Sequence, residues 1–367
     1  MEALPPLHGL RVVEFARILA GPWAGQIFAD LGAEVIKVES PAGDDTRRWG
    51  PPFVEHEDGS REAAYFHATN RGKQFVTIDF ATPEGQAQAR ELAANADVLI
   101  ENFKVGGLVR YGLDYPSLSA INPRLVYCSI TGFGQDGPYA ARPGYDFIAQ
   151  GLSGIMDLTG EPDGPPQKIG VAYADIMTGL YAVIAIHAAL AERERSGMGQ
   201  QIDMALLDVM VGTLANQAMN YLVSGVAPSR AGNVHPNIAP YQSYATSDGW
   251  IILAVGNDEQ FQRCCAVLGV EPHENLATNA GRVEHRTPMN TMLIPAIAAR
   301  PRDELLAALT AAGVPAGPIN SVADAFNDPQ VRHRGMAIAV AQSDGGAAIP
   351  GLRLPIVFSR SPLAFPC

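Results

Sequence analysis

Short apolar runs alternate with helix-forming segments through the first half of the chain. Residues 11–15 form the first run, and a predicted helix follows, with Pro22 in its first turn and Gly32 just past its end. A second apolar run, residues 34–38, comes directly after, and a strand–helix–strand unit with such short connections predicts parallel strands. The alternation continues with strands expected at 75–79, 97–100 and 125–130 and helices at 83–94 and 115–121. This pattern is typical of a doubly wound α/β sheet.

The pattern changes in the second half of the chain. Two long helices are expected at 174–195 and 206–223 with a short strand at 202–204 between them, and residues 224–233 are rich in turn formers. A β-hairpin is then expected over 241–255, with its turn at 246–249, followed by helices at 258–268 and 303–312. Residues from about 240 to 325 are therefore expected to form a separate, smaller α+β unit.

The charge balance argues against some classes of partner. Among 367 residues, 26 are Lys or Arg and 38 are Asp or Glu, which gives a formal net charge of −12. We do not expect so acidic a chain to bind duplex nucleic acid or an anionic membrane surface, whereas a phosphate-bearing small molecule needs only a few local cations. Charged residues make up 17% of the chain, against about 25% in typical globular proteins, and this favours an oligomer that covers part of the surface.

Several familiar site motifs do not occur in the sequence. The turn after the first strand, residues 20–25, has two glycines but not the GxGxxG spacing of dinucleotide-binding sheets, and there is no P-loop. GxSxG, HExxH and CxxC motifs are also missing, so a hydride-transfer dehydrogenase, an α/β-hydrolase and a metal site are not predicted. The first residues lack the features of a signal peptide, and the longest apolar stretch is short for a membrane span, so a cytoplasmic location is expected.

Two segments carry candidate chemistry. Residues 129–139 form a glycine-rich polar loop at the carboxyl end of a predicted strand, where open α/β sheets bind ligands. Asp175 stands alone between apolar residues at the start of the long helix. It is either an N-cap that accepts backbone N–H groups, or a carboxylate nucleophile beside which the helix N-terminus also stabilises an oxyanion. Basic residues in turn-like stretches are either phosphate partners or ordinary solvated charges: Arg47, Arg48, Arg71, Lys73, Lys104 and Arg110.

Short motifs also occur in order along nearly the whole chain. They are LAGP at 19–22, DLGAEVIKVE at 30–39, GDDTR at 43–47, NRGK at 70–73, ENF at 101–103, GFGQDGP at 132–138, GYD at 144–146, AD at 174–175 and GVPAGPI at 313–319. Together they resemble the class III (CaiB/BaiF) coenzyme A transferases, the family that also contains the α-methylacyl-CoA racemases. The resemblance implies a Rossmann-like large domain over residues 1–224, a small domain with linkers over 225–325, and a segment returning to the large domain over 326–367. It also implies an interlocked homodimer.

The resemblance implies CoA transfer through Asp175, with acyl-CoA as a substrate rather than a resident cofactor. The aspartate attacks the donor thioester to give a mixed anhydride, and the released CoA thiolate converts this anhydride into an aspartyl-CoA thioester. The acceptor carboxylate then repeats the steps in reverse. By motif position, CoA contacts are expected from Ala20, Arg71, Lys73, Asn102, Phe103, Arg110 and Tyr145.

Differences from neighbouring branches of the family bear on the substrate. Leu19, an expected substrate contact, stands where the formyl-CoA:oxalate branch has glutamine, and residues 232–241 lack that branch's glycine run, so oxalate is not the expected acceptor. Residues 43–53 and 235–242 look most like the dicarboxylate branch, of the succinyl-CoA:hydroxymethylglutarate or glutarate type. His235 then either helps to bind the distal carboxylate of the acceptor or is an ordinary loop histidine.

Two alternatives stay open from the sequence alone. An α-methylacyl-CoA racemase needs a histidine at the position of Tyr145, and a phenol with a reference pKa of about 10 is a poor acid–base substitute. A non-catalytic CoA-binding scaffold is expected to lack the aspartate, which this chain retains as Asp175. We therefore expect a CoA-transferase that moves CoA from a dicarboxylyl-CoA such as succinyl-CoA to a carboxylic acid.

Overall fold

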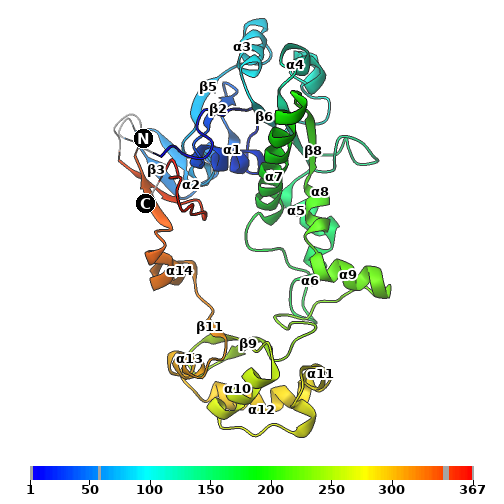
Figure 1. Cartoon of the computed structure of the whole chain (residues 1–367), viewed down its shortest axis with the longest axis vertical. Coiled ribbons are helices and arrows are strands. Elements are labelled where there is room, and N and C mark those ends of the chain that lie inside the picture. Colours follow the sequence, from blue (N-terminus) through cyan, green and yellow to red (C-terminus); the bar gives the residue numbers. More distant parts are fainter. Residues whose placement is uncertain (1–2, 57–58, 342–346, 366–367) are drawn as a thin grey trace. The chain divides into compact units, whose positions relative to one another are not determined.

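The computed structural model describes residues 3–56, 59–341 and 347–365. The chain divides into two compact units (Figure 1). The first unit comprises residues 1–156, 168–226 and 329–367, and the second comprises 157–167 and 227–328. The expected boundaries lie near 224 and 325, and the expectation did not separate 157–167 from the large domain. Arg230 holds this segment, because its Nη1 donates to the backbone oxygen (3.0 Å) and to Oδ1 (2.7 Å) of Asp157.

A six-stranded parallel sheet forms the centre of the first unit. Its strands, in spatial order, are β5 (Gln74–Thr77), β2 (Glu34–Glu39), β1 (Arg11–Glu14), β6 (Val98–Glu101), β7 (Val126–Thr131) and β8 (Gln201–Ala205). The prediction of a parallel α/β sheet is confirmed. This order is that of doubly wound dinucleotide-binding sheets, which bind ligands beyond the carboxyl ends of the strands where the winding reverses. Here the reversal lies between β1 and β6.

Neighbouring side chains along each strand enter opposite cores. Val12 and Ile100 pack on the side of α1 (Ala20–Asp30), α7 (Tyr173–Ser196) and α8 (Leu206–Gly212). Val13 and Leu99 pack on the side of α3 (Pro83–Ala94) and α4 (Tyr115–Ile121). Because both faces of the sheet are covered, its inner strands are apolar at consecutive positions, which explains the short continuous runs in the sequence.

The single helix expected at 206–223 is wrong, because the structure has two helices there. α8 ends at Gly212, and α9 (Ala215–Ser224) begins after a two-residue turn with Ala215 at a positive φ of 49°. No residue of α9 is buried. The other described elements of this unit are η1 (Asp45–Arg48), β3 (Phe53–Glu55), β4 (Arg61–Ala63), α2 (Ala64–His67), η2 (Val109–Tyr111), α5 (Asp146–Ser153), α15 (Pro329–His333), β12 (Ala337–Val340) and β13 (Ile349–Leu352), with α6 (Ile155–Leu158) at the unit boundary.

The second unit is a small α+β fold. Its sheet is antiparallel, in the order β11 (Ala316–Pro318), β10 (Trp250–Ala254) and β9 (Tyr241–Ala245), so the predicted hairpin is confirmed. Its core contains Phe261, Leu293 and the adjacent Cys264 and Cys265, which are free thiols. Its helices are α10 (Asp258–Leu268), η3 (Glu274–Leu276), α11 (Asn279–Glu284), α12 (Arg286–Ala298), α13 (Arg302–Ala311) and α14 (Val322–Asn327).

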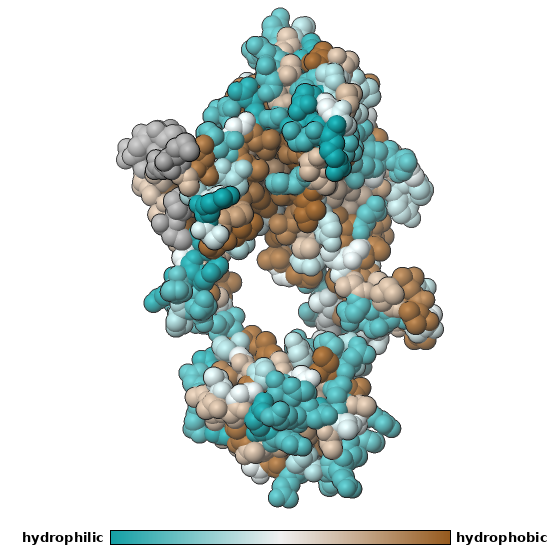
Figure 2. Space-filling view, viewed as in Figure 1, coloured by the Kyte–Doolittle hydropathy of each residue, from teal (hydrophilic) through white to brown (hydrophobic). Residues whose placement is uncertain are grey.

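The helix α7 has one buried side and one exposed apolar side. By length and composition alone it could cross a membrane, but Ala182 and Ile186 pack in the core of the first unit, and α7 lies against α1. Its exposed side presents Leu180, Tyr181 and Ile184, the last 63% exposed. Figure 2 shows apolar side chains gathered over this part of the first unit. Exposed apolar surfaces of this kind are commonly sites of contact with a protein, a membrane or a ligand.

Candidate active site

A cavity of about 360 Å³ opens at the carboxyl ends of β1, β6 and β7, where the winding of the sheet reverses. Loop residues 17–20, 102–110 and 140–146 contribute most of its wall, and α7 contributes Asp175. This is the place where doubly wound sheets bind their ligands, because loops from neighbouring strands diverge there.

The cavity brings together most of the residues that the sequence singled out. Leu19, Ala20, Asn102, Phe103, Arg110, Tyr145 and Asp175 all line it. Asn102 also ties two of the loops together, since its Oδ1 accepts the N–H of Arg17 (3.0 Å) and its Nδ2 donates to the Arg17 backbone oxygen (2.7 Å). Its amide therefore shapes the wall of the cavity. The roles of these residues in binding CoA stay predictions.

The N-cap interpretation of Asp175 is wrong. The N-cap of α7 is Ala172, and Asp175 lies in the first turn without a capping hydrogen bond. Asp146 takes the capping role instead: its Oδ1 accepts the N–H groups of Ala174 (2.8 Å) and Asp175 (3.3 Å), and its Oδ2 accepts from Gln150 Nε2 (2.8 Å). Among the described residues, the Asp175 carboxylate has no hydrogen-bond partner, so it is left free toward the cavity.

The same contacts limit what the helix end can do. The sequence suggested that first-turn N–H groups of the long helix stabilise an oxyanion beside Asp175. Those of Ala174 and Asp175 are bound to Asp146, and that of Ile176 donates to the backbone oxygen of Ala172 (3.1 Å). An oxyanion at this site therefore needs donors from another element.

Asp175 has the electrostatics of a reactive carboxylate. Burial raises the pKa of its carboxyl group to about 7, and the negative charge of Asp146 adds to this rise. A carboxylate with a raised pKa is a stronger base and nucleophile than an exposed one, and its ionised form is the reactive form. The Asp175 carboxyl group is thus about half ionised at pH 7 and mostly ionised above it.

Tyr65, which the sequence analysis did not single out, does not line the cavity but lies near its acidic residues. Burial raises the pKa of its phenol to about 12, and the negative charges of Asp175, Asp146 and Asp44 add to the rise, so the phenol lies near these carboxylates. Trp49 packs edge-on against the Tyr65 ring at 5.4 Å. Because Tyr65 lies on α2, far from Asp175 in sequence, no spacing pattern connects the two. Its hydroxyl stays protonated at neutral pH and is a hydrogen-bond donor.

The cavity wall carries cations without acidic partners. Among the described residues, Lys104, Arg110 and Arg142 line the cavity and form no ion pair, whereas Arg17 pairs with Asp45 (3.0 Å). Arg142 lies over the ring of Tyr139 at 4.4 Å, which orients its guanidinium. The sequence analysis missed Arg142, although it lies only three residues beyond the glycine-rich loop. Three unpaired cations around one cavity favour a ligand with several negative charges.

Arg71 and Lys73 lie elsewhere, in buried ion pairs. Arg71 Nη2 is 2.5 Å from Asp30 Oδ2, and Lys73 Nζ is 2.8 Å from Glu14 Oε2. Lys73 Nζ also donates to the backbone oxygen of Pro22 (2.9 Å), and burial lowers its pKa to about 8. Neither residue lines the cavity, because both fasten the segment around them to α1 and β1. The prediction that they contact CoA phosphates stays untested.

A buried charge cluster holds the loop after β1 in place. Lys37 Nζ lies 2.9 Å from Glu14 Oε1 and 3.0 Å from Asp44 Oδ2, and these side chains are almost completely buried. Asp44 Oδ2 also accepts the N–H of Ile18 (3.2 Å), a β-branched residue at a positive φ of 74°. Such a conformation is strained and persists only where its surroundings fix it. Asp44 thus fixes the strained residue next to Leu19 in the cavity wall.

A family model described as CoA-transferase family III matches residues 7–366. The chain belongs to CoA-transferase family III. It is 57% identical over 98% of its length to the succinate–glutarate CoA-transferase of Agrobacterium fabrum, covering 91% of that protein. It is 40% identical over 96% of its length to the human succinyl-CoA:glutarate CoA-transferase, covering 80% of that protein. A solved structure of a CaiB/BaiF family protein from Brucella suis superposes with a TM-score of 0.90 at 61% identity, covering 99% of this chain and 95% of that one.

Two positions that distinguish branches of family III lie in different units. Tyr145, where the racemases need a histidine, lines the cavity and is 60% exposed. His235 belongs to the second unit, where its Nδ1 accepts the N–H of Asn237 (3.1 Å) and its ring packs against Tyr241 at 5.1 Å. Its role in binding an acceptor carboxylate stays a prediction.

Proposed function

We propose that this family III CoA-transferase moves CoA from succinyl-CoA to glutarate, with Asp175 as the nucleophile. The observation that carries the proposal is the Asp175 carboxylate, which lies in a cavity lined by unpaired cations and has no hydrogen-bond partner among the described residues. The choice of succinyl-CoA and glutarate is supported by the names of the relatives from Agrobacterium fabrum and human.

The reaction proceeds through two exchanges at the Asp175 carboxyl group. The Asp175 oxygen attacks the succinyl thioester, the carbon–sulfur bond breaks, and CoA leaves as the thiolate from a succinyl–aspartyl anhydride. The thiolate then attacks the aspartyl carbon and expels succinate, which leaves an aspartyl-CoA thioester. Glutarate attacks this thioester to give a glutaryl–aspartyl anhydride and free thiolate. Attack of the thiolate on the glutaryl carbon gives glutaryl-CoA and restores the Asp175 carboxylate.

Binding of CoA is assigned to the exposed cations of the cavity. CoA carries several phosphate charges, and Lys104, Arg110 and Arg142 are the unpaired cations of this wall among the described residues. We leave Arg71 and Lys73 out of the binding set, because their nitrogen atoms are already bound to Asp30 and Glu14. CoA arrives and leaves with each turnover, so it is a substrate here rather than a resident cofactor.

We also propose that the chain works as a homodimer. Exposed apolar side chains cover three helices of the first unit: Phe147 and Leu152 on α5, Leu180 and Ile184 on α7, and Leu222 and Val223 on α9, the last 81% exposed. Faces of this kind are costly in water and are normally covered by a partner. A second copy of the chain also accounts for the low fraction of charged residues, 17%.

The test offers succinyl-CoA to the protein with a panel of mono- and dicarboxylic acids and identifies products by mass. We expect glutaryl-CoA and free succinate to form together. Asp175→Ala should lower the rate of glutaryl-CoA formation by at least about 10³-fold while CoA still binds. The control Asp163→Ala, at an exposed position of the second unit, should leave this rate unchanged.

A trapping experiment tests the covalent route separately. Acyl-CoA with hydroxylamine should leave a hydroxamate on Asp175, and a protein without an adduct there would contradict the mechanism. A racemase would instead exchange solvent deuterium into the α-carbon of an acyl-CoA without an acceptor acid.

A further inference from the structure

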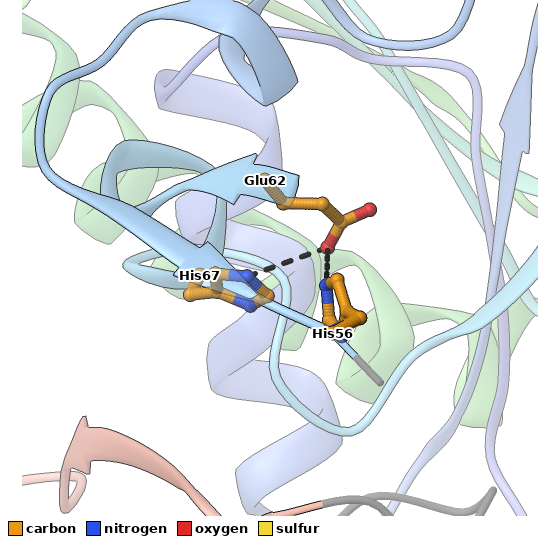
Figure 3. A group of neighbouring side chains, drawn as sticks. All are labelled: His56, Glu62 and His67. Atoms are coloured by element: carbon orange, nitrogen blue, oxygen red, sulfur yellow. Dashed lines mark ion pairs between the residues drawn. The ribbon is translucent and has the colours of Figure 1, made fainter. Parts of the chain in front are cut away.

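Two histidines and a glutamate gather at the β3–β4 hairpin, outside the candidate active site. His56 follows β3, Glu62 lies in β4 and His67 ends α2 (Figure 3). One ligand atom from each side chain lies within 4.8 Å of the other two, and all three residues are partly buried. The sequence analysis predicted no metal site, because the spacing of these residues matches no common metal motif.

The distances in this cluster are those between ligands of a small metal ion. The Nε2 atoms of His67 and His56 lie 3.3 and 3.6 Å from the same oxygen, Glu62 Oε2. Two ligands about 2.0–2.1 Å from a tetrahedral zinc ion are themselves about 3.3 Å apart. Among the described residues, His67 Nε2 is buried without a hydrogen-bond partner, so the contact with Glu62 does not satisfy it as a hydrogen bond would. The imidazole rings do not stack, since their centres are 6.4 Å apart at 55°.

The other oxygen of Glu62 is already oriented. Arg47 Nη1 donates to Glu62 Oε1, and Arg47 also pairs with Glu39 through Nη2 (2.9 Å). The guanidinium is fixed further by its place over the Phe66 ring at 3.8 Å. This arrangement leaves Oε2 free to bind an ion while Oε1 is held by a second residue, which is the usual support of a carboxylate ligand.

We propose that His56, Glu62 and His67 form a binding site for a divalent transition metal ion, with zinc as the best match. Two imidazoles and one carboxylate suit zinc better than calcium or magnesium, which prefer oxygen ligands. A cavity of about 340 Å³ lies beside the three residues and is bounded on another side by Val340 and Pro350, so water can complete the coordination. The site is of the three-ligand kind that keeps one position open.

The site is connected to the loop that lines the active site. Glu62 holds Arg47, Arg47 holds Glu39, and Glu39 Oε2 accepts the N–H of Asp44 (3.1 Å). Asp44 in turn fixes Ile18. A bound ion would therefore stiffen the hairpin and α2, and through them the support of this loop. The inference goes beyond the proposed CoA transfer, since none of its ligands lines the catalytic cavity.

The test measures metal binding directly, without acyl-CoA. Protein freed of metal with a chelator is titrated with Co²⁺, whose visible absorption reports coordination, and then with Zn²⁺ as competitor. We expect one ion per chain. His67→Gln and Glu62→Gln should each weaken binding at least about 100-fold, because each removes a ligand. His273→Gln, an exposed histidine of the second unit, and Asp175→Ala should bind normally.

Two results would overturn the proposal. One is a wild-type protein that binds no stoichiometric Co²⁺ or Zn²⁺, and the other is binding that survives in both ligand variants. Circular dichroism and retained CoA binding establish that each variant is folded. If His67→Gln does not fold, His56→Gln replaces it as the second ligand variant, because His56 lies beyond the end of β3 rather than within a helix. Because Asp175→Ala is expected to bind metal, failure of the metal site and failure of the transferase mechanism are distinguishable.

Discussion

Two aspartates near the first turn of α7 have separate roles, which the sequence left as alternatives for Asp175 alone. Asp146 caps the helix, and Asp175 is left with a free carboxylate and a raised pKa. The sequence could not separate these roles, because the cap comes from another helix, α5. The same limit explains why the sequence placed Arg71 and Lys73 at the CoA site. They form ion pairs away from the cavity, with residues 41 and 59 positions distant in the chain. Motifs identified the chemistry of each residue but not its partner.

The first prediction concerns the pH dependence of the reaction. If ionised Asp175 is the nucleophile, kcat/KM should fall below about pH 7, because the pKa of Asp175 in the free enzyme is about 7. Asp146→Asn removes the neighbouring negative charge, so the acid limb should shift to lower pH, by about one unit or less since burial is the larger cause. A pH series of initial rates measures this shift. The assignment of the acid limb to Asp175 would be contradicted if this limb did not move in Asp146→Asn, or if it moved equally in Asp163→Asn.

The second prediction concerns stability. The pKa of Asp175 is about 7 in the folded protein, against an ordinary value of 3.8 for an aspartate, so between these pH values the folded state holds a proton that the unfolded state has lost. Stability from this group therefore falls as pH rises from about 4 to 7, by at most about 4 kcal/mol. Asp175→Asn removes this cost, so its free energy of unfolding in urea should exceed that of the wild type at pH 8 and approach it near pH 4. Equal midpoints at pH 8 would refute the raised pKa.

At the scale of elements, the sequence predicted helices with capped starts and missed a break inside a long apolar stretch. α3 and α10 begin and end at the expected residues, because side chains of Thr82 and Asn257 cap them. The expected helix at 206–223 is broken before Ala215, an alanine at positive φ, which no local preference predicts. Gly212, the last residue of α8, is a local signal for a break, but apolar residues continue beyond it, and the pattern therefore favoured one continuous helix.

The close approach of α1 and α7 gives the third prediction. A Cβ atom at Gly179 would lie 2.7 Å from the backbone oxygen of Ala20 and 3.0 Å from Trp23 Cδ1. Gly179→Ala should therefore destabilise the protein by about 1–3 kcal/mol, although alanine is the better helix former. Its kcat/KM should also fall, because the contact lies one turn from Asp175 and at the start of α1. Denaturation midpoints and initial rates measure both effects.

A matched glycine provides the control for this prediction. Gly212 ends α8 with nothing within 4 Å of its Cβ position. Gly212→Ala should raise the free energy of unfolding by about 0.5–1 kcal/mol. Equal effects of the two substitutions would show that packing between α1 and α7 is not tight.

At the scale of the molecule, the sequence anticipated an α/β sheet, a smaller α+β unit and a surface poor in charge. It did not anticipate which faces are apolar, because α7 combines core and surface positions in one apolar stretch. Within the first unit, exposed apolar side chains lie on α5, α7 and α9, and they form the surface proposed for a second copy. The position of the ligand cavity follows from the strand order, which βα alternation alone does not fix.

The fourth prediction tests this surface. Light scattering should give a particle of twice the chain mass of 39.0 kDa. Ile184→Glu, at a position 63% exposed on α7, should shift this mass toward that of one chain, because it would bury a charge in the proposed interface. Glu194→Lys, an exposed change near the end of the same helix, should not. A monomeric wild type, or an Ile184→Glu protein that remains fully dimeric, would refute the proposed interface.

The turn after β1 has a consequence for how long a ligand stays. Dinucleotide-binding sheets use glycines there, so that backbone N–H groups reach the pyrophosphate and retain the cofactor. Here Ile18 occupies the positive-φ position, and Pro22 in the first turn of α1 has no N–H. In the proposed function the phosphates are held instead by exposed side chains, those of Lys104, Arg110 and Arg142. Salt weakens ion pairs between exposed side chains and phosphates, and water competes for the same hydrogen-bonding atoms. We therefore expect CoA to exchange rapidly at this site, as suits a substrate that enters and leaves with each turnover of the proposed reaction.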